Sequence, residues 1–318
     1  MEALVSTPTP SYAKDLARAV FQVRGKRLLE IGILEETVEQ RFADFFRKFQ
    51  TKLITATSRG CVKGYQVLYF REDQVLELNP GTILGGFPVI LEGENHPQQV
   101  ARLLFEESNN IVPTQGVDSL EIVTSLEEEQ NPLTSLFQQQ GFQIEQKYAE
   151  MIYCLSPASK DPQVPGNISI HPLREASKEV LLECYLEAFR TGDAPFFHSQ
   201  SQVQQSNFFE TLGLDDARSH PASMILVDGK KLLGFSMVIG YGQQNAHVSC
   251  MCIEQTYRGK GLGKMLLQMI FHKAWENGDK TITLGTDIRM KAFQLYVKHG
   301  FEVTNASILW RKRNPKQP

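Results

Sequence analysis

The stretch YRGKGLGKMLL, residues 257–267, decides how the C-terminal half of this 318-residue chain is interpreted. Three glycines lie among basic residues, and an apolar helical pattern follows at once. The segment before it, NAHVSCMCI at 245–253, is typical of a strand. A glycine loop between a strand and a helix binds anions, because its N–H groups converge and the helix dipole favours negative charge. The stretch therefore predicts a phosphate-binding loop; the alternative is a basic glycine turn that only caps a helix.

Neither of the two familiar nucleotide loops fits this stretch. A Walker A loop requires GxxxxGK followed by Ser or Thr. The interval from Gly259 to Gly263 is one residue too short, and Met265 stands where the magnesium-binding hydroxyl would be. A dinucleotide fingerprint requires GxGxxG. Gly261 and Gly263 supply its first pair, but residue 266 is Leu, so another phosphate ligand is expected.

Two motifs together indicate a family. Residues 258–263 match R/Q-x-x-G-x-G/A, and RMKAFQLYVKHGF at 289–301 matches N-x-x-A-x-x-L-Y-x-x-x-G-F. With the expected strand and helix between them, the C-terminal half resembles the GCN5-related N-acetyltransferase (GNAT) family. The one departure is Arg289, where the family often has an Asn that contacts the cofactor, so the role of this position is open.

The resemblance implies acetyl-CoA as the co-substrate. In the family, the backbone amides of the loop bind the pyrophosphate of CoA. The corresponding residues here are Arg258, Gly259, Lys260, Gly261, Leu262, Gly263 and Lys264. The two lysines add positive charge. The preceding strand would pair its backbone with the pantetheine arm at Met251, Cys252 and Ile253.

The reaction implied by the resemblance is attack of a neutral amine on a thioester, which requires a base and an acid. The usual acid of the family is the tyrosine of the second motif, so Tyr296 is expected to protonate the leaving thiolate. Its alternative role is that of a helix tyrosine at a packing interface. His247 is the candidate base, because it alone in the preceding strand titrates near neutrality. The alternatives are a histidine held by a satisfied hydrogen bond, and deprotonation through ordered water.

A zinc site is rejected for the same strand, so no metal is expected. Strand alternation predicts that Cys250 and Cys252 face one side and His247 the other, and the spacing is not a ligand pattern. The cysteines are then interpreted as small buried apolar residues.

Acceptor selection is assigned to the loop TGDAPFFHSQSQ, residues 191–202, which also contains Asp193. Gly and Pro interrupt a helical pattern there, and the residues offered to a substrate are Asp193, Phe196, Phe197 and His198. The alternative is that this loop serves packing alone.

The chain is divided by SPASKDPQVPGN, residues 156–167, which is rich in proline and typical of a linker. This predicts two domains, 1–157 and 164–318. Segments 133–155 and 292–312 both read as a helix, Gly-Phe and two extended runs. We therefore expect a tandem duplication of a mixed-sheet α/β (α+β) domain, that is, two GNAT-like domains; the alternative is chance similarity. The basic residues RKRNPKQP, 311–318, are expected to form a solvated tail.

The N-terminal half lacks the chemistry of the loop. Its counterpart should fall at LEGENHPQQV, residues 91–100, which has no RxxGxG pattern. Glu92 and Glu94 would repel phosphates, and Pro97 removes an N–H donor. Phe137 stands at the position of Tyr296 and has no hydroxyl. We expect this half to bind no CoA, and to shape the acceptor pocket or to mediate a homodimer.

Composition argues against several classes of binding partner and against a membrane-spanning protein. The net charge is −3 and the pI is near 6.2, so neither nucleic acid nor a membrane surface is an expected partner. No apolar run approaches the ~20 residues of a membrane helix. The N-terminus does not read as a signal peptide, and five scattered cysteines suit a reducing cytoplasm.

The predicted function is an acetyl-CoA-dependent N-acetyltransferase that acts on a primary amine of a small molecule or protein. The alternative from another class is a non-catalytic acyl-CoA-binding sensor or scaffold. The loop reads only the CoA phosphates, so O-acyl transfer and a longer acyl donor also stay open.

Overall fold

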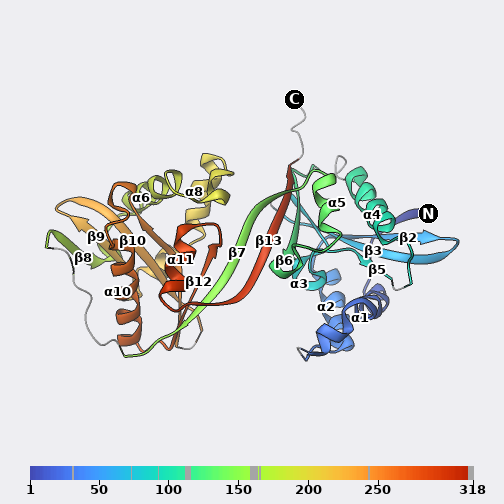
Figure 1. Cartoon of the computed structure of the whole chain (residues 1–318), viewed down its shortest axis with the longest axis horizontal. Helices are drawn as coiled ribbons and strands as arrows, with labels where there is room; N and C mark the ends of the chain where they lie inside the picture. Colours follow the sequence, from blue (N-terminus) through green and yellow to red (C-terminus); the bar gives the residue numbers. More distant parts are fainter. Residues whose placement is uncertain are drawn as a thin grey trace. The chain divides into compact units, whose positions relative to one another are not determined.

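The computed structural model describes residues 1–30, 32–72, 74–91, 93–111, 116–157, 164, 166–242 and 244–313. These residues form two compact units (Figure 1). Unit 1 comprises Met1–Glu145 and the C-terminal segment that begins at Ser307, and unit 2 comprises Gln146–Ala306. Among the described residues, no helix is long and apolar enough to cross a membrane.

Unit 2 is built on a mixed sheet with helices on both faces. Its strands lie in the order β8 (Ile168–Pro172), β9 (Met224–Asp228), β10 (Lys231–Gly240), β11 (Asn245–Ile253), β12 (Thr281–Asp287) and β7 (Gln143–Cys154). All neighbouring pairs are antiparallel except β11 and β12. One face packs against α10 (Leu262–Glu276) and α11 (Lys291–Lys298). The other packs against α6 (Lys178–Arg190), α7 (Pro195–His198), α8 (Gln202–Glu210) and α9 (Leu214–Ala217).

Unit 1 repeats this arrangement. Its strands lie in the order β1 (Glu2–Ser6), β2 (Thr51–Ser58), β3 (Cys61–Phe70), β4 (Val75–Leu78), β6 (Ser119–Ser125) and β13 (Glu302–Arg313), with β5 (Val89–Ile90) paired to β3. The parallel pair, β4 and β6, takes the same place as β11 and β12. One face carries α1 (Tyr12–Glu30) and α2 (Glu35–Lys48); the other carries α4 (Pro97–Ile111) and α5 (Thr134–Gln139). The predicted fold class, a tandem of two related α/β domains, is confirmed.

The Gly-Phe turns that suggested the duplication have the same geometry in both units. Gly141 and Gly300 adopt φ of 86° and 89°, the left-handed conformation that glycine adopts at lowest cost. Behind them, the N–H of Phe142 donates to Phe137 O at 2.9 Å, and the N–H of Phe301 donates to Tyr296 O at 3.1 Å. Phe137 therefore takes the structural place of Tyr296, as the sequence predicts.

The last strand of each unit comes from the other half of the sequence. In unit 2, β7 pairs with β12 from Tyr148↔Asp287 to Cys154↔Thr281. In unit 1, β13 pairs with β6 from Ser307↔Ser125 to Arg313↔Ser119. The boundary thus lies at 145/146 rather than in the expected linker 156–167, and it differs from the predicted domains 1–157 and 164–318. Residues 158–163 and 165 of that linker lie outside the described residues.

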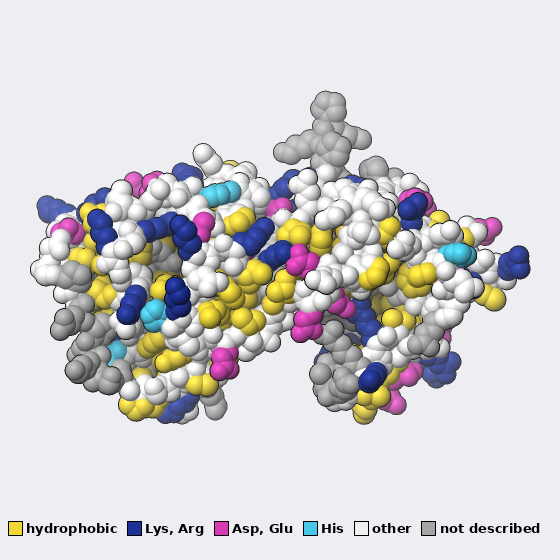
Figure 2. Space-filling model, viewed as in Figure 1, with side chains coloured by type: hydrophobic (Ala, Val, Ile, Leu, Met, Phe, Trp, Pro, Cys, Tyr) yellow, Lys and Arg dark blue, Asp and Glu magenta, His cyan; other side chains and the backbone are white. Residues whose placement is uncertain are grey.

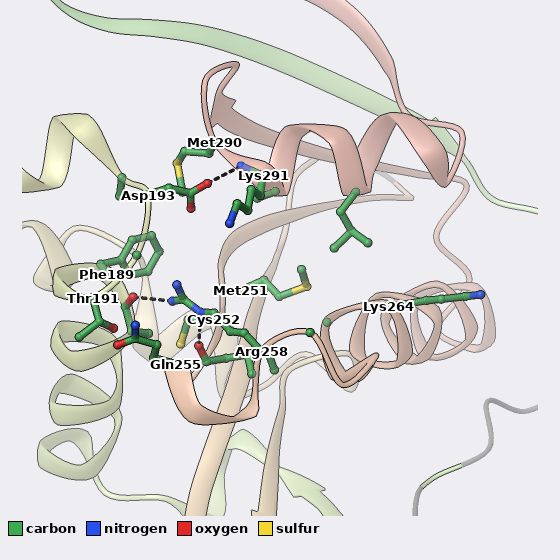
Figure 3. A pocket seen from close by; sticks show the side chains of 18 of the residues that line it. Phe189, Thr191, Asp193, Met251, Cys252, Gln255, Arg258, Lys264, Met290 and Lys291 are labelled. Atoms are coloured by element: carbon green, nitrogen blue, oxygen red, sulfur yellow. Dashed lines mark hydrogen bonds between the residues drawn. The ribbon is translucent and has the colours of Figure 1, made fainter.

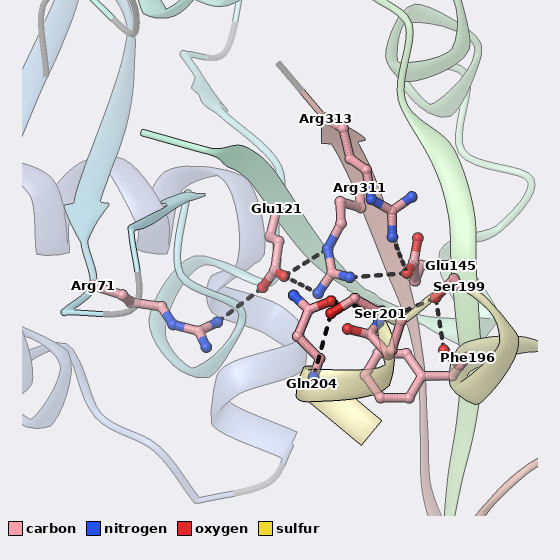
Figure 4. Close-up of polar contacts among 10 residues, drawn as sticks. Arg71, Glu121, Glu145, Phe196, Ser199, Ser201, Gln204, Arg311 and Arg313 are labelled. Atoms are coloured by element: carbon pink, nitrogen blue, oxygen red, sulfur yellow. Dashed lines mark hydrogen bonds and ion pairs between the residues drawn. The ribbon is translucent and has the colours of Figure 1, made fainter. Parts of the chain in front are cut away.

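Arginines of β13 anchor this exchanged strand to unit 1 (Figure 4). Arg311 donates from Nη1 to Glu145 at 2.8 Å and from Nε to Glu121 at 2.9 Å, and both carboxylates are buried. Arg71 and Arg313 bind the same two carboxylates at 2.8 and 2.7 Å. The expectation of a solvated tail is therefore wrong for residues 311–313, because strand pairing places Arg311 and Arg313 beside buried carboxylates and Lys312 beside the amide oxygen of Asn109. Residues 314–318 lie outside the described residues.

Candidate active site

A cavity of about 760 Å³ lies in unit 2 between four segments (Figure 3). They are the α6–α7 loop, the end of β11, the glycine loop and the start of α11. Ten of the residues singled out by sequence line it: Asp193, Met251, Cys252, Ile253, Arg258, Gly259, Gly261, Gly263, Lys264 and Tyr296. Lys260, Leu262, His247, Phe196, Phe197 and His198 are not among the lining residues.

The glycine loop ends in an uncapped helix N-terminus. Gly259 and Gly261 adopt φ of 73° and 84°, and Gly261 is the N-cap of α10. The first intrahelical bond runs from the N–H of Met265 to Gly261 O at 3.0 Å. The preceding N–H groups of the first turn therefore have no acceptor within the helix, and the N-cap residue, Gly261, has no side chain to cap them. This end of α10 has the geometry of an anion cradle.

The third glycine of the loop, Gly263, is not required by a left-handed backbone. Gly263 is helical, and a Cβ at this position would lie 3.7 Å from Leu295 Cδ2, an ordinary contact. Alanine would fit here, whereas Gly259 and Gly261 need the left-handed conformation. The loop geometry thus agrees with the G-x-G/A form of the motif.

The basic residues of the loop divide between structure and cavity. Arg258 donates from Nε to Ile253 O at 2.9 Å and from Nη2 to Ala188 O, so its guanidinium ties the loop to the end of α6. Lys264 lines the cavity, whereas Lys260 Nζ lies 4.7 Å from the centre of the Tyr257 ring. Lys and Arg side chains gather over the α10 and α11 region of the face of unit 2 that is visible in Figure 2. This charge suits an anionic ligand.

A bulge in β11 opens the sheet beside the loop. Met237 of β10 pairs with Cys250, but the next residue, Val238, pairs with Val248, so Ser249 is an extra residue. The parallel ladder between β11 and β12 runs from Asn245↔Thr281 to Val248↔Leu284 and ends there, as far as the described residues show. Beyond this point the two strands are no longer paired, which leaves the backbone edge of β11 open to an extended ligand.

The bulge also changes which face of β11 carries His247. Ala246 and Val248 pack in the core under α10, whereas Cys250 and Cys252 pack in the core under α6. Because the extra residue inverts the alternation, His247 lies on the same face as the two cysteines, and the predicted opposition was wrong. The cysteines are buried among apolar side chains together with Cys184, which confirms their interpretation as core residues.

Tyr296 is a buried phenol at the cavity wall. Its ring is 6% exposed and packs against Phe301, with ring centres 5.6 Å apart. Burial raises the pKa of Tyr296 far above that of a free phenol, and the nearby thiols of Cys250 and Cys252 add to this shift. The hydroxyl therefore stays protonated and able to donate throughout the physiological range.

His247 lies outside the cavity but close to the strand opening. Its Nδ1 is 3.0 Å from Thr283 Oγ1, and the ring is half-buried. Burial lowers the pKa of His247, while the carboxylate of Glu150 opposes this shift. The imidazole is thus neutral near pH 7 and able to accept a proton. The hydrogen bond to Thr283 also matches the alternative reading of this residue.

Of the four residues expected from the α6–α7 loop, Asp193 lines the cavity and Phe196, Phe197 and His198 do not. Phe197 is buried and packs against Tyr185 and Phe189. His198 Nε2 lies 3.1 Å from two carbonyl oxygens at the end of α6, and the ring of Phe196 lies 6.2 Å from that of Phe208. The loop lines the cavity through Asp193 and its neighbours Thr191, Gly192 and Ala194.

Two contacts at the site could not be predicted from the sequence. Asp193 accepts a hydrogen bond from the N–H of Lys291 at the start of α11 (Figure 3). Arg289, which replaces the usual Asn, forms a bidentate pair with Asp287 at 2.8 and 2.6 Å. An Asp in a loop and an Asp-x-Arg triplet are common, so neither pattern identifies these contacts in advance.

The equivalent opening in unit 1 is filled by the chain itself. After β4 ends, α3 (Gly81–Leu84) and the following turn pack on β6. A Cβ at Gly81 would lie 3.0 Å from Val123 O, and one at Gly86 would clash with the same carbonyl. Phe87 then stacks on Phe137, with ring centres 5.4 Å apart. Glu94 accepts from the N–H of His96 just before α4, whereas Glu92 lies outside the described residues.

Comparisons with known proteins agree with this geometry. Residues 178–301 match the Acetyltransferase (GNAT) family model. No curated protein matches the chain. A GCN5-related N-acetyltransferase from Sphaerobacter thermophilus is 15% identical, with a TM-score of 0.59 over 98% of this chain and 95% of that one. A functionally unknown conserved protein from Staphylococcus epidermidis is 13% identical, with a TM-score of 0.53 over 86% and 98%.

A third solved structure is a GCN5-related glucosamine N-acetyltransferase region of a fungal multi-domain GH3 beta-N-acetylglucosaminidase. It is 11% identical, with a TM-score of 0.54 over 98% of this chain and 38% of that one. At such identities the likeness shows the fold alone, whereas the family match rests on residues 178–301, which contain the glycine loop and Tyr296. Unit 2 therefore belongs to the acetyltransferase (GNAT) family, and the chain is a tandem of two units with the GNAT fold.

Proposed function

We propose that unit 2 transfers an acetyl group from acetyl-CoA to a primary amine of a small molecule or protein. The observation that carries the proposal is the uncapped start of α10 beside an opened parallel strand pair, with Tyr296 on the wall of the same cavity. An N-terminus of this kind suits the diphosphate of CoA, and the free edge of β11 suits an extended amide-bearing arm.

The residues present fit that substrate. The N–H groups of Leu262, Gly263 and Lys264 would bind the diphosphate, and the ammonium of Lys264 adds charge. The backbone of Met251 and Ile253 would pair with the pantetheine arm. Lys260 would act only at long range, because its ammonium lies over Tyr257.

The proposed reaction follows from which groups of the site can donate or accept a proton. The amine nitrogen forms a bond to the thioester carbon, the C–S bond breaks, and the thiolate takes a proton. Tyr296 suits the acid role because its phenol is protonated, lines the cavity and is kept neutral by burial. His247 is the proposed proton acceptor from the ammonium, acting through water because it lies outside the cavity lining.

We further propose that unit 1 binds no CoA. Its own loop occupies the place of the strand opening, and Phe87 covers the ring that replaces Tyr296. Calorimetric titration should therefore give one CoA per chain, and two sites would contradict this part of the proposal.

Thiol release from acetyl-CoA, measured with a panel of amines and lysine peptides, tests the function. Tyr296→Phe should bind CoA normally and lose on the order of 10²-fold or more in kcat. Tyr185→Phe is the matched control, since this phenol is buried in the same unit but does not line the cavity. If CoA binds and no amine is acetylated, the chain is a CoA-binding module instead.

A further inference from the structure

The exchanged strand β7 pairs with β12, which borders the strand opening of unit 2, and carries polar side chains on one face. Glu150 pairs with Gly285 and Tyr148 pairs with Asp287, and residues paired across a ladder point to the same face. Ala149 and Met151 of the same strand point the other way, into the core under α10. Tyr148 and Glu150 therefore share a face with Thr283 and with its partner His247.

Tyr148 lies across β12 at a glycine. A Cβ built on Gly285 would fall on the hydroxyl and Cζ of Tyr148, and 2.8 Å from its Cε2. Only a residue without a side chain leaves room for the phenol at this position. Gly285 directly follows Leu284, where the ladder between β11 and β12 ends. The phenol oxygen thus lies over the strand at the point where the sheet opens.

Glu150 supplies negative charge to the same face. Its side chain is exposed, and Oε2 lies 3.4 Å from Asn305 Nδ2. The carboxylate is near enough to both His247 and Tyr148 to raise the pKa of each. Burial is the larger influence on both groups: it raises the pKa of Tyr148, which stays a neutral donor, and lowers that of His247, which stays a neutral acceptor. A carboxylate, a neutral phenol and a neutral imidazole together suit a bound ammonium group, because the carboxylate attracts its charge and the imidazole accepts its proton.

We propose that β7 builds the acceptor side of the active site: Tyr148 hydrogen-bonds the reacting groups at the strand opening, and Glu150 binds the acceptor as a primary ammonium. This inference rests on the proposed function. It implies that residues at the N-terminal end of unit 2, on strand β7 from the first half of the sequence, select the amine. The ammonium would meet Glu150, pass its proton toward His247 and present its lone pair at the opening.

The test compares Glu150→Gln and Tyr148→Phe with two matched variants of unit 2. Tyr153→Phe makes the same change on the opposite face of β7, where the ring stacks on Phe271 at 4.3 Å. Glu276→Gln removes an exposed carboxylate at the end of α10. Thiol release is measured against amine concentration at saturating acetyl-CoA, and amine binding to the CoA complex is measured by calorimetry.

Glu150→Gln should raise the KM and the Kd for the amine on the order of tenfold, as loss of a charge-assisted hydrogen bond predicts. Tyr148→Phe should lower kcat, and both controls should match the unmodified chain. CoA affinity should be unchanged in all four. If Glu150→Gln and Tyr148→Phe behave like their controls, or if no amine binds the CoA complex, the inference is overturned. Failure of the proposed function is separate: it appears as amine binding without thiol release.

Discussion

Asp193 in the α6–α7 loop accepts a hydrogen bond from the backbone N–H of Lys291 at 2.7 Å, across 98 positions of sequence. Lys291 is the first residue of α11, whose N-cap residue, Met290, offers no side-chain cap. The carboxylate of Asp193, distant in sequence, therefore caps the N-terminus of the helix that carries Tyr296. Both residues line the cavity, so the bond links the position of this helix to the wall of the site.

Removal of this bond should weaken both stability and catalysis. Asp193→Ala should lower the free energy of unfolding by about 1 kcal/mol, the usual value of a lost cap. It should also lower kcat more than CoA affinity, because α11 carries Tyr296. Asp193→Asn retains an oxygen acceptor and should stay close to the unmodified chain in urea unfolding and in thiol release. Equal losses in the two variants would show that charge, and not the cap, matters at this position.

The loop glycines should differ sharply in their tolerance of alanine. Gly261→Ala imposes a left-handed conformation on a residue with a Cβ, at a cost of about 1–2 kcal/mol, and should reduce CoA affinity measured by calorimetry. Gly263→Ala places its methyl group at an ordinary distance from Leu295 and should bind CoA normally. A loss of affinity in Gly263→Ala alone would contradict the assigned cradle.

Arg311 should be essential to unit 1. Arg311→Met leaves Glu121 and Glu145 buried with fewer partners, and breaking a buried ion pair costs about 3–5 kcal/mol. Arg313→Met, whose side chain is 53% exposed, should cost clearly less. Urea unfolding with a probe in unit 1 measures both, and equal effects would remove Arg311 as the anchor of β13.

The acidic limb of the pH–rate profile should report His247. Because burial holds its folded pKa below the usual 6.5, the neutral base persists to lower pH, and activity should fall only below about pH 6.5. Glu150 opposes this shift, so Glu150→Gln should move the limb to still lower pH. His247→Gln should abolish the limb. A limb that is unchanged in His247→Gln would assign it to another group.

The lowered pKa of His247 also predicts that the free energy of unfolding decreases as the solution becomes more acidic. A group with a depressed folded pKa stabilises the fold above its unfolded pKa, and this contribution disappears as the pH falls through the folded value. The effect should be visible for His247 and for His220, whose pKa burial also lowers although Asp279 opposes it. Urea unfolding between pH 7 and pH 5 should show stability falling with pH, and His220→Asn should flatten part of the curve.

Gly285 and Tyr148 should be energetically coupled. Gly285→Ala overlaps the phenol of Tyr148 and should cost about 1–3 kcal/mol, as overpacking does. In a Tyr148→Ala background the added methyl group has room, so most of that cost should vanish. A double-mutant cycle in urea measures the difference. Additive effects would mean that the ring does not occupy this space.

Much of the fold could be predicted because its signals are local. Gly141 and Gly300 had to be left-handed after a helix, and the alternation of apolar residues marked most strands. The glycine loop was recognisable because Gly259 and Gly261 adopt conformations that other residues avoid. Even the replacement of Tyr296 by Phe137 followed from aligning two Gly-Phe turns.

The face of His247 could not be predicted, since a single extra residue at Ser249 inverts the alternation of β11. Nothing in the residue types marks that bulge. The acceptor loop was placed at the cavity, but helix formation at 195–198 turned Phe197 into the core and left Asp193 at the wall.

The sequence by itself determined the strand–loop–helix unit, the position of Tyr296 and the duplication, because each depends on backbone preferences within a few residues. Only the tertiary structure decided which strand completes which sheet. A strand pattern specifies a buried face but not its partner, so β7 and β13 gave no sign that they exchange units. That exchange brings Tyr148 and Glu150 beside the opening of β11 and β12, and places Arg311 between two buried carboxylates of unit 1.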